Sequence, residues 1–258
     1  STTFPKDLWV SRVVASKHKK ERVYVTLNGY RWDDFKPYVY FSDDYGQTWT
    51  SIAPKLETLS VNVLVEDNVN PNILYLGSDN GVYISFDQGK NWQTFNNGMP
   101  PVAVHDMVIQ TEAHDLVVGT HGRSIYKVNL KSIQQLNEET LASDLKIFSV
   151  DNLAHSDFWG STWSKWLPAN EPKIDVDYYV KNQGEIMFQV IHENGMVVFE
   201  EKQTASTGIN QWKYDVEISK TGIEKWKKKD KKVTLTESKN GKMYLIPGKY
   251  QIKITQGE

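Results

Sequence analysis

Two eight-residue stretches repeat one pattern: Ser42-Asp43-Asp44-Tyr45-Gly46-Gln47-Thr48-Trp49 and Ser85-Phe86-Asp87-Gln88-Gly89-Lys90-Asn91-Trp92. Both have the form S-x-D-x-G-x-x-W, and they begin 43 residues apart, a spacing that suits a four-stranded β-propeller blade. In a tight turn the aspartate can accept backbone hydrogen bonds, and the glycine can adopt a conformation that a Cβ would penalise. The tryptophan can bury a large ring against its blade. The repeat therefore predicts a propeller.

Strand-like runs recur around the two motifs in the same order. Apolar runs open each unit at 9–15, 61–65 and 104–109; second runs follow at 23–27, 73–77 and 116–119, and third runs at 38–42, 82–85 and 124–128. The first two units continue through the motif into a fourth strand, whereas the third unit ends after three. We therefore expect three consecutive blades over residues 1–130. Such an arc needs the remaining blades as partners, from upstream sequence or from another chain.

The pair of motifs resembles the Asp-box, or BNR, repeats of sialidases, xyloglucanases and sortilin-type propellers. Five further segments resemble the C-terminal part of sortilin-like exported bacterial proteins of the "glycosyl hydrolase, BNR repeat" type: 9–15, 37–40, 61–63, 104–106 and 119–125. This resemblance covers residues 9 to about 150. It implies a propeller in an exported bacterial protein, located in the periplasm, at the cell surface or outside the cell. The chain itself carries no signal-peptide pattern.

Residues 131–172 are expected to form a linker. Ser132-Ile133-Gln134-Gln135 has a capping-box pattern, which predicts a short helix. A dense aromatic segment follows, with Phe158, Trp159, Trp163 and Trp166. These aromatic rings could stack on a glycan, or they could pack where the two predicted domains meet.

Residues 173–258 have the alternation of a sandwich. Polar and apolar residues alternate over 174–180, and Glu193-Asn194-Gly195 is a strong turn signal. Short motifs, Gly208-x-Asn210-x-Trp212 and Pro247-Gly248-x-Tyr250, resemble the immunoglobulin-like sandwich of flagellar hook-capping proteins. The predicted fold is therefore all-β: a three-bladed part of an Asp-box propeller followed by an immunoglobulin-like β-sandwich. The lysine-rich stretch 220–242 is expected to be a solvated insertion or, alternatively, an anion-binding patch.

The bulk composition excludes several classes of function. The 258 residues contain no cysteine, so disulfide and thiolate chemistry are excluded. The net charge is −2 and the isoelectric point is about 6.3, so no nucleic-acid partner is expected. No apolar run approaches the roughly 20 residues of a transmembrane segment. No cofactor or metal site is expected, because the sequence has no metal-spaced histidine pair and no glycine-rich phosphate loop.

Candidate binding residues lie on the expected innermost strands and in the last turn. Alignment of the three units places Ser11, Asn62 and His105 in register, and Arg12 level with Asp106. The candidates for a channel rim are Arg12, Asn62, His105, Asp106, His121 and Arg123. They could bind a peptide or glycan. Alternatively, Arg12 and Asp106 could pair with each other to hold the ring.

No catalytic residue is assigned. Only four arginines occur, and no sialidase-like cluster of three is recognisable; Asp106 also lacks a second carboxylate of the kind that glycosidases use. The motif residues Ser42, Asp44, Gly46, Trp49, Ser85, Asp87, Gly89 and Trp92 are expected to build turns, rather than to catalyse or to bind metal. The sequence favours a non-catalytic binding or scaffold module. The alternative is part of a glycoside hydrolase whose other catalytic residues lie upstream.

Overall fold

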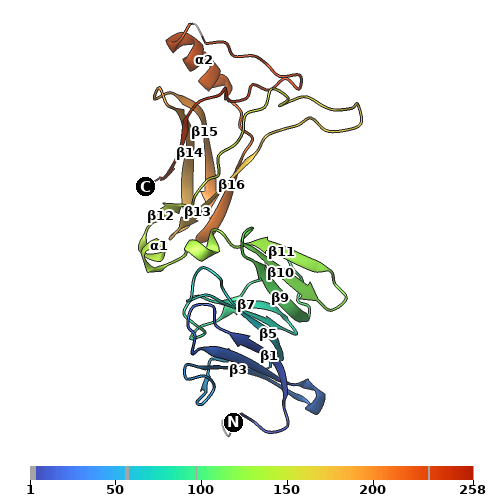
Figure 1. Ribbon diagram of the computed structural model, residues 1–258. Coiled ribbons are helices and arrows are strands. Elements are labelled where there is room, and N and C mark those ends of the chain that lie inside the picture. The colour runs from blue at the N-terminus through green and yellow to red at the C-terminus, as the bar shows by residue number, and fades with distance from the viewer. Residues whose placement is uncertain (1–3, 56–57, 97, 232, 258) are drawn as a thin grey trace. The chain divides into compact units, whose positions relative to one another are not determined.

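Antiparallel sheets dominate the computed structural model, which describes residues 4–55, 58–96, 98–231 and 233–257 (Figure 1). The chain divides into two units, Ser1–Gln134 and Gln135–Glu258. The N-terminal unit contains three successive sheets. Their strands are β1 (Trp9–Ala15), β2 (Val23–Gly29), β3 (Asp34–Ser42) and β4 (Thr50–Ser51); β5 (Val61–Glu66), β6 (Leu74–Ser78), β7 (Gly81–Ser85) and β8 (Gln93–Thr94); and β9 (Val104–Gln110), β10 (Asp115–Thr120) and β11 (Ile125–Asn129).

Each sheet follows chain order, β1-β2-β3-β4, β5-β6-β7-β8 and β9-β10-β11, as in a propeller blade. A 3-10 turn, η1 (Tyr30–Trp32), separates β2 from β3. The prediction of an all-β chain that begins with three propeller blades is confirmed. The predicted division at residues 130 and 172 stays a prediction.

The blades pack against each other through apolar faces. Every residue of β6 and β7 is buried, because the second blade is covered on both sides. One apolar cluster joins the first blade to the second, through residues such as Tyr24, Val39, Leu64 and Leu76. A second cluster joins the second blade to the third, through Val63, Tyr75, Met107 and Leu116 among others.

The innermost strand of each blade carries a bulge at the same place. The register of β1 with β2 shifts between Val10 and Arg12, that of β5 with β6 between Val61 and Val63, and that of β9 with β10 between Val104 and Asp106. The extra residues are Ser11, Asn62 and His105, so their predicted alignment is confirmed. A bulge redirects a side chain away from the regular pleat.

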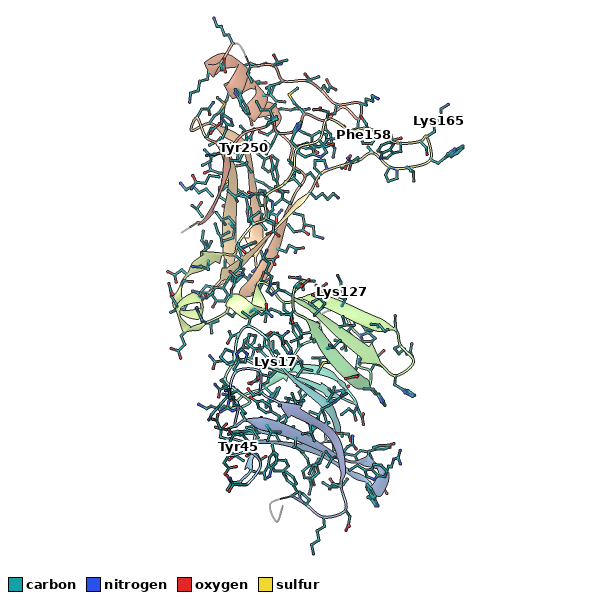
Figure 2. All side chains as sticks on the ribbon, viewed as in Figure 1. Lys17, Tyr45, Lys127, Phe158, Lys165 and Tyr250 are labelled. Atoms are coloured by element: carbon teal, nitrogen blue, oxygen red, sulfur yellow. The ribbon has the colours of Figure 1, made fainter. Side chains whose placement is uncertain are left out.

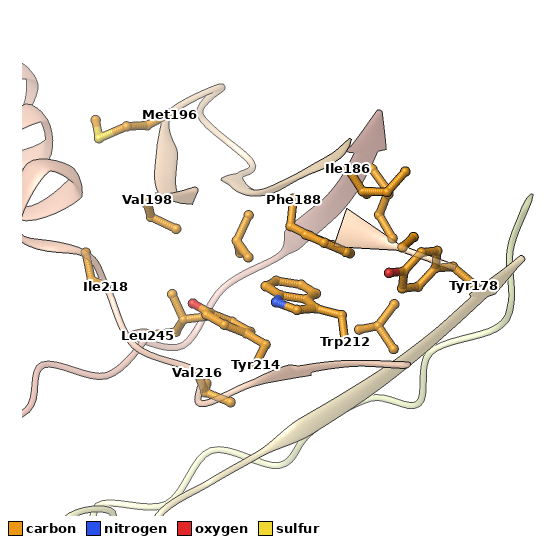
Figure 3. Packing of buried hydrophobic residues seen from close by; sticks show 14 of the residues in the cluster. Tyr178, Ile186, Phe188, Met196, Val198, Trp212, Tyr214, Val216, Ile218 and Leu245 are labelled. Atoms are coloured by element: carbon orange, nitrogen blue, oxygen red, sulfur yellow. The ribbon is translucent and has the colours of Figure 1, made fainter. Parts of the chain in front are cut away.

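The C-terminal unit contains two three-stranded sheets, with orders β12-β13-β16 and β15-β14-β17. The strands are β12 (Leu145–Ile147), β13 (Ile174–Val180), β14 (Gly184–His192), β15 (Val197–Ala205), β16 (Gly208–Tyr214) and β17 (Tyr250–Gln256). One cluster contains residues of both sheets, and Phe188 stacks on Trp212 with ring centroids 4.6 Å apart (Figure 3). The two sheets therefore form a sandwich. Its immunoglobulin-like character stays a prediction.

Helical elements near the start of this unit differ from the capping-box expectation. The stretch after Ser132 forms only a 3-10 turn, η2 (Ile133–Gln135). The α-helix α1 (Glu138–Ala142) begins later, and its cap is Asn137, whose Oδ1 accepts from the amide of Thr140 at 2.8 Å. An asparagine side chain at this position satisfies an amide that has no partner within the helix.

The expectation of a solvated insertion over 220–242 is wrong for its first half. Residues Lys220–Lys229 form the helix α2, capped by Ser219, whose Oγ accepts from the amide of Gly222 at 3.0 Å. Trp226 on this helix is buried in the core of the sandwich, and Ile223 packs beside it. The lysines thus belong to a helix whose apolar face anchors it to the core. Lys232 lies outside the described residues.

Replacing Trp226 with alanine tests this anchor. The change removes a buried indole and leaves a cavity, so the free energy of unfolding should fall by about 3–5 kcal/mol. Lys228→Ala, on the exposed part of the same helix, should change it by no more than about 0.5 kcal/mol. Urea unfolding of the full chain measures both. A Trp226→Ala variant as stable as the wild type would show that α2 is not part of the core.

Candidate functional site

The two Asp-box motifs form the same turn, bond for bond. Residues 42–49 connect β3 to β4, and residues 85–92 connect β7 to β8. In the first turn, Ser42 Oγ accepts from the Gly46 amide at 2.8 Å and donates to Asp44 at 2.6 Å. Asp44 also accepts from the amide of Thr48 at 2.8 Å and from its hydroxyl at 2.6 Å. These bonds occupy the Asp44 carboxylate within its own loop.

The second turn repeats the first. Ser85 Oγ accepts from the Gly89 amide at 2.8 Å, and Asp87 accepts from the amide and the side chain of Asn91 at 2.8 and 2.7 Å. Gly46 and Gly89 have φ angles of +86° and +87°, which glycine adopts without strain. The geometry supports turn-building by Ser42, Asp44, Ser85 and Asp87.

Hydrogen bonds shift the acidity of both motif aspartates. The side-chain bonds from Ser42 and Thr48 lower the pKa of Asp44 to about 2. For Asp87, burial acts to raise the pKa, but the bonds from Asn91 and Ser85 outweigh it and the pKa is lowered. Both carboxylates therefore stay ionised at neutral pH.

The second motif also contacts the preceding blade. Trp92 Nε1 donates to the carbonyl of Ile52 at 2.8 Å, and a Cβ on Gly89 would lie 2.9 Å from the Ile52 side chain. Trp49, the tryptophan of the first motif, instead packs against Phe4, with ring centroids 5.0 Å apart. The second motif thus serves the contact between blades as well as its own turn.

The bulged side chains hydrogen-bond from one innermost strand to the next. Ser11 Oγ donates to the carbonyl of Val61 at 3.2 Å, and Asn62 Nδ2 donates to the carbonyl of Val104 at 3.1 Å. Each acceptor is the residue immediately before the next bulge. The same bond therefore occurs at both contacts between blades.

Asn62 also links the ends of two second strands. Its Oδ1 accepts from Asn28 Nδ2 at 2.8 Å, and its Nδ2 donates to Asp79 at 2.8 Å. Asn28 is the next-to-last residue of β2 and Asp79 follows β6, at equivalent places in the first two blades. The predicted rim residue Asn62 is thus engaged by neighbouring side chains.

Arg12 and Asp106 form an ion pair between the first and third blades. Arg12 Nη2 lies 2.5 Å from Asp106 Oδ1, so the arginine reaches across β5. A hollow of about 110 Å³ adjoins this arginine and is lined by Val65 and Met107 among others. The structure therefore brings these two predicted residues together as partners of each other.

The three remaining candidates lie exposed on the third blade. The rings of His105 and His121 are 5.1 Å apart, and Arg123 follows in the turn between β10 and β11. Among the described contacts, no hydrogen bond or ring contact joins Arg123 to either histidine. Arg12, Asn62 and Asp106 thus have side-chain partners in neighbouring blades, although Asp106 is also exposed, whereas His105, His121 and Arg123 lie on the third blade alone.

Sequence reasoning missed the buried carboxylates at the end of β5. Glu66 accepts from the amide of Lys17 at 2.7 Å, from Ser16 Oγ at 2.9 Å and from the hydroxyl of Tyr24 at 2.9 Å, all on the first blade. Burial, together with the charge of Glu66, raises the pKa of Tyr24. The neighbouring Asp67 is fully buried and accepts from the amides of two following residues. The sequence signal that could have revealed these carboxylates is the pair of adjacent acidic residues at the end of an apolar strand.

The chain is similar to one known protein family. A family model described as "Sortilin, neurotensin receptor 3" matches residues 37–206. The chain belongs to the sortilin family. A comparison with curated proteins gives no match.

Several solved structures are similar to this member of the sortilin family. An ancestral GH74 enzyme is 16% identical, with a TM-score of 0.38 over 80% of this chain and 27% of that one. A GH74 enzyme from Niastella koreensis is 15% identical, with a TM-score of 0.40 over 76% of this chain and 30% of that one. The GH74 xyloglucanase from Xanthomonas campestris is 13% identical, with a TM-score of 0.36 over 84% and 32%. The chain spans less than a third of each of these structures. Within the described residues, none of the helices is both long and apolar enough to cross a membrane.

The lowered pKa of Asp44 predicts acid sensitivity. Its pKa is about 2 in the folded chain, against about 3.9 in an unfolded one. Its contribution to stability is therefore fully present above pH 4 and is lost as the pH falls toward 2. Asp44→Asn should lower the urea midpoint at pH 7, and the difference from the wild type should shrink at pH 2.

Asp33→Asn is the matched control for this experiment. Asp33 is exposed and has a φ of 57°, a conformation that asparagine tolerates. This variant should follow the wild-type pH dependence. If Asp44→Asn also followed it, the turn would not draw stability from the ionised carboxylate.

Proposed function

We propose that this chain is a non-catalytic binding or scaffold module of an exported bacterial propeller protein, located in the periplasm, at the cell surface or outside the cell. Its ligand is a peptide or a glycan, bound at the third-blade end of the rim. The observation that carries the proposal is the bonding of the acidic side chains on the innermost strands. Glu66 and Asp106 both have partners in neighbouring blades.

A glycosidase needs two carboxyl groups at a set separation, one as acid and the other as base or nucleophile. Asp106 is instead paired with Arg12, whose Nη2 lies 2.5 Å from Asp106 Oδ1. Glu66 is buried and accepts from three groups of the first blade. These contacts support a structural role for both acids. The family description also names a receptor, which supports binding rather than catalysis.

Further blades, from upstream sequence or another chain, complete the ring in this proposal. On β1, Val10 is 57% exposed and Val13 is 59% exposed. The equivalent residues of the second blade, Val61 and Leu64, are buried beneath the first blade. The same apolar face is thus covered on the second blade and open on the first. This difference supports a further blade that packs against β1.

The ligand-binding groups in this proposal are His105, His121 and Arg123. All three are exposed, whereas Arg12 and Asn62 are engaged between blades. A guanidinium group can bind a peptide carboxylate through two parallel hydrogen bonds, and imidazole can donate to carboxylates or hydroxyls. The same groups could serve the hydroxyls of a glycan.

Peptide and glycan arrays probed with the purified chain test this function. Arg123→Ala should weaken binding to the best array ligand by about tenfold, since a hydrogen bond to a charged group contributes about 1.5–3 kcal/mol. Lys20→Ala removes an exposed positive charge from the first blade and should leave binding unchanged. Equal binding by wild type and Arg123→Ala would remove this site from the proposal.

Release of reducing sugars from polysaccharides tests the alternative. The proposal expects no release above background by the protein that contains this chain. Hydrolysis that disappears in Asp106→Asn would contradict the proposal and favour the glycoside hydrolase.

A further inference from the structure

A loop projects from the C-terminal unit and carries two tryptophans, Trp163 and Trp166. Figure 2 shows Lys165 at the far end of this loop and Phe158 at its base. The neck is closed by two backbone hydrogen bonds: the Gly160 amide donates to the Asn170 carbonyl at 2.8 Å, and the Asn170 amide donates to the Ser161 carbonyl at 2.7 Å. The segment between them, residues 161–170, is called the Trp tip below.

Side chains at the base hold the Trp tip in place. Trp159 packs against the core of the sandwich, with its ring centroid 5.9 Å from that of Tyr244. The ring of His155 meets the same tryptophan at 4.8 Å. These contacts anchor the base of the loop on the sandwich, and the Trp tip extends from that base.

The apolar side chains of the Trp tip face solvent. Trp163 is 82% exposed and Trp166 is 93% exposed, and Leu167 is also exposed. Trp163 rests on Phe158, with ring centroids 4.5 Å apart. Two exposed indoles and a leucine within five residues are costly in water. Such a cluster marks a surface that meets another apolar phase.

The hydroxyl groups of the Trp tip bond within the tip itself. The hydroxyl of Thr162 donates to the carbonyl of Ser164, and Ser164 Oγ accepts from the amide of Trp166 at 3.3 Å. Lys165 is the only charged side chain from Phe158 to Asn170. The tip thus offers indole N–H groups and one cation, with no acidic group.

We propose that the Trp tip inserts into the interfacial region of an anionic lipid bilayer. Tryptophan favours the level of the lipid headgroups, with its ring in the apolar phase and its N–H toward water. Leu167 adds apolar area, and the stem of Lys165 can reach back so that its ammonium meets an anionic headgroup. The hollow beside Trp163 is lined mainly by apolar side chains, with Ser156 and Asn170 as its polar residues. This lining favours an apolar phase over a sugar, which needs several directional polar groups beside the rings. This site is independent of the rim proposed above.

Vesicle flotation with the full chain tests the insertion. Vesicles of about three parts phosphatidylcholine to one part phosphatidylglycerol supply the anionic surface. The wild type should float with them, and Trp163→Ala/Trp166→Ala should reduce the bound fraction about fivefold or more. Lys165→Glu should weaken binding to these vesicles and leave binding to pure phosphatidylcholine unchanged. Because these side chains are exposed, all variants should keep the wild-type unfolding temperature.

Trp32→Ala is the matched control, because Trp32 is an exposed tryptophan in the other unit; it should bind vesicles like the wild type. Wild type that fails to float would overturn the proposal, and so would a Trp163→Ala/Trp166→Ala variant that floats equally well. Protection of the tip tryptophans by an oligosaccharide, in the absence of vesicle binding, would also overturn it and assign the Trp tip to a glycan. None of these outcomes depends on binding at His105, His121 or Arg123.

Discussion

A hydrogen bond from the bulged side chain of one innermost strand to a carbonyl of the next recurs between the blades. Ser11 makes it to Val61, and Asn62 makes it to Val104. Apolar faces alone are non-directional and would allow neighbouring sheets to slide, whereas this bond fixes one position. It also requires close approach, and Gly77 permits it, because a Cβ there would lie 2.7 Å from Val104.

The opposite ends of the innermost strands are held by other polar groups. Lys17 Nζ donates to Asn68 at 2.6 Å, and Asn68 donates to Thr111 at 2.8 Å, so equivalent positions of three blades are linked in series. Glu66 adds a buried link at the same end. Both ends of the innermost strands therefore use polar side chains to join the blades. The proposed function assigns recognition to the exposed residues His105, His121 and Arg123 of the third blade.

The repeats predicted the blades and their common positions, whereas single features such as Glu66 and helix α2 were missed. The spacing of the motifs predicted the blades, and aligning the units predicted the common place of Ser11, Asn62 and His105. The Arg12–Asp106 pair was one of two alternatives, because the sequence does not show that arginine can reach over β5. Glu66 was missed because its partner Tyr24 lies 42 positions away. Helix α2 was missed because its lysines concealed the apolar pair Ile223 and Trp226.

Native-state hydrogen exchange measures most directly whether these bonds make the blades one cooperative unit. The amides of β5 and β6 should exchange with the same free energy of opening as those of β9 and β10, equal to that of unfolding the whole N-terminal unit. A lower, separate opening energy for β9–β11 would contradict the account, because the contacts that Asn62 and Arg12 make to the third blade would then be too weak to couple its unfolding to that of the other blades.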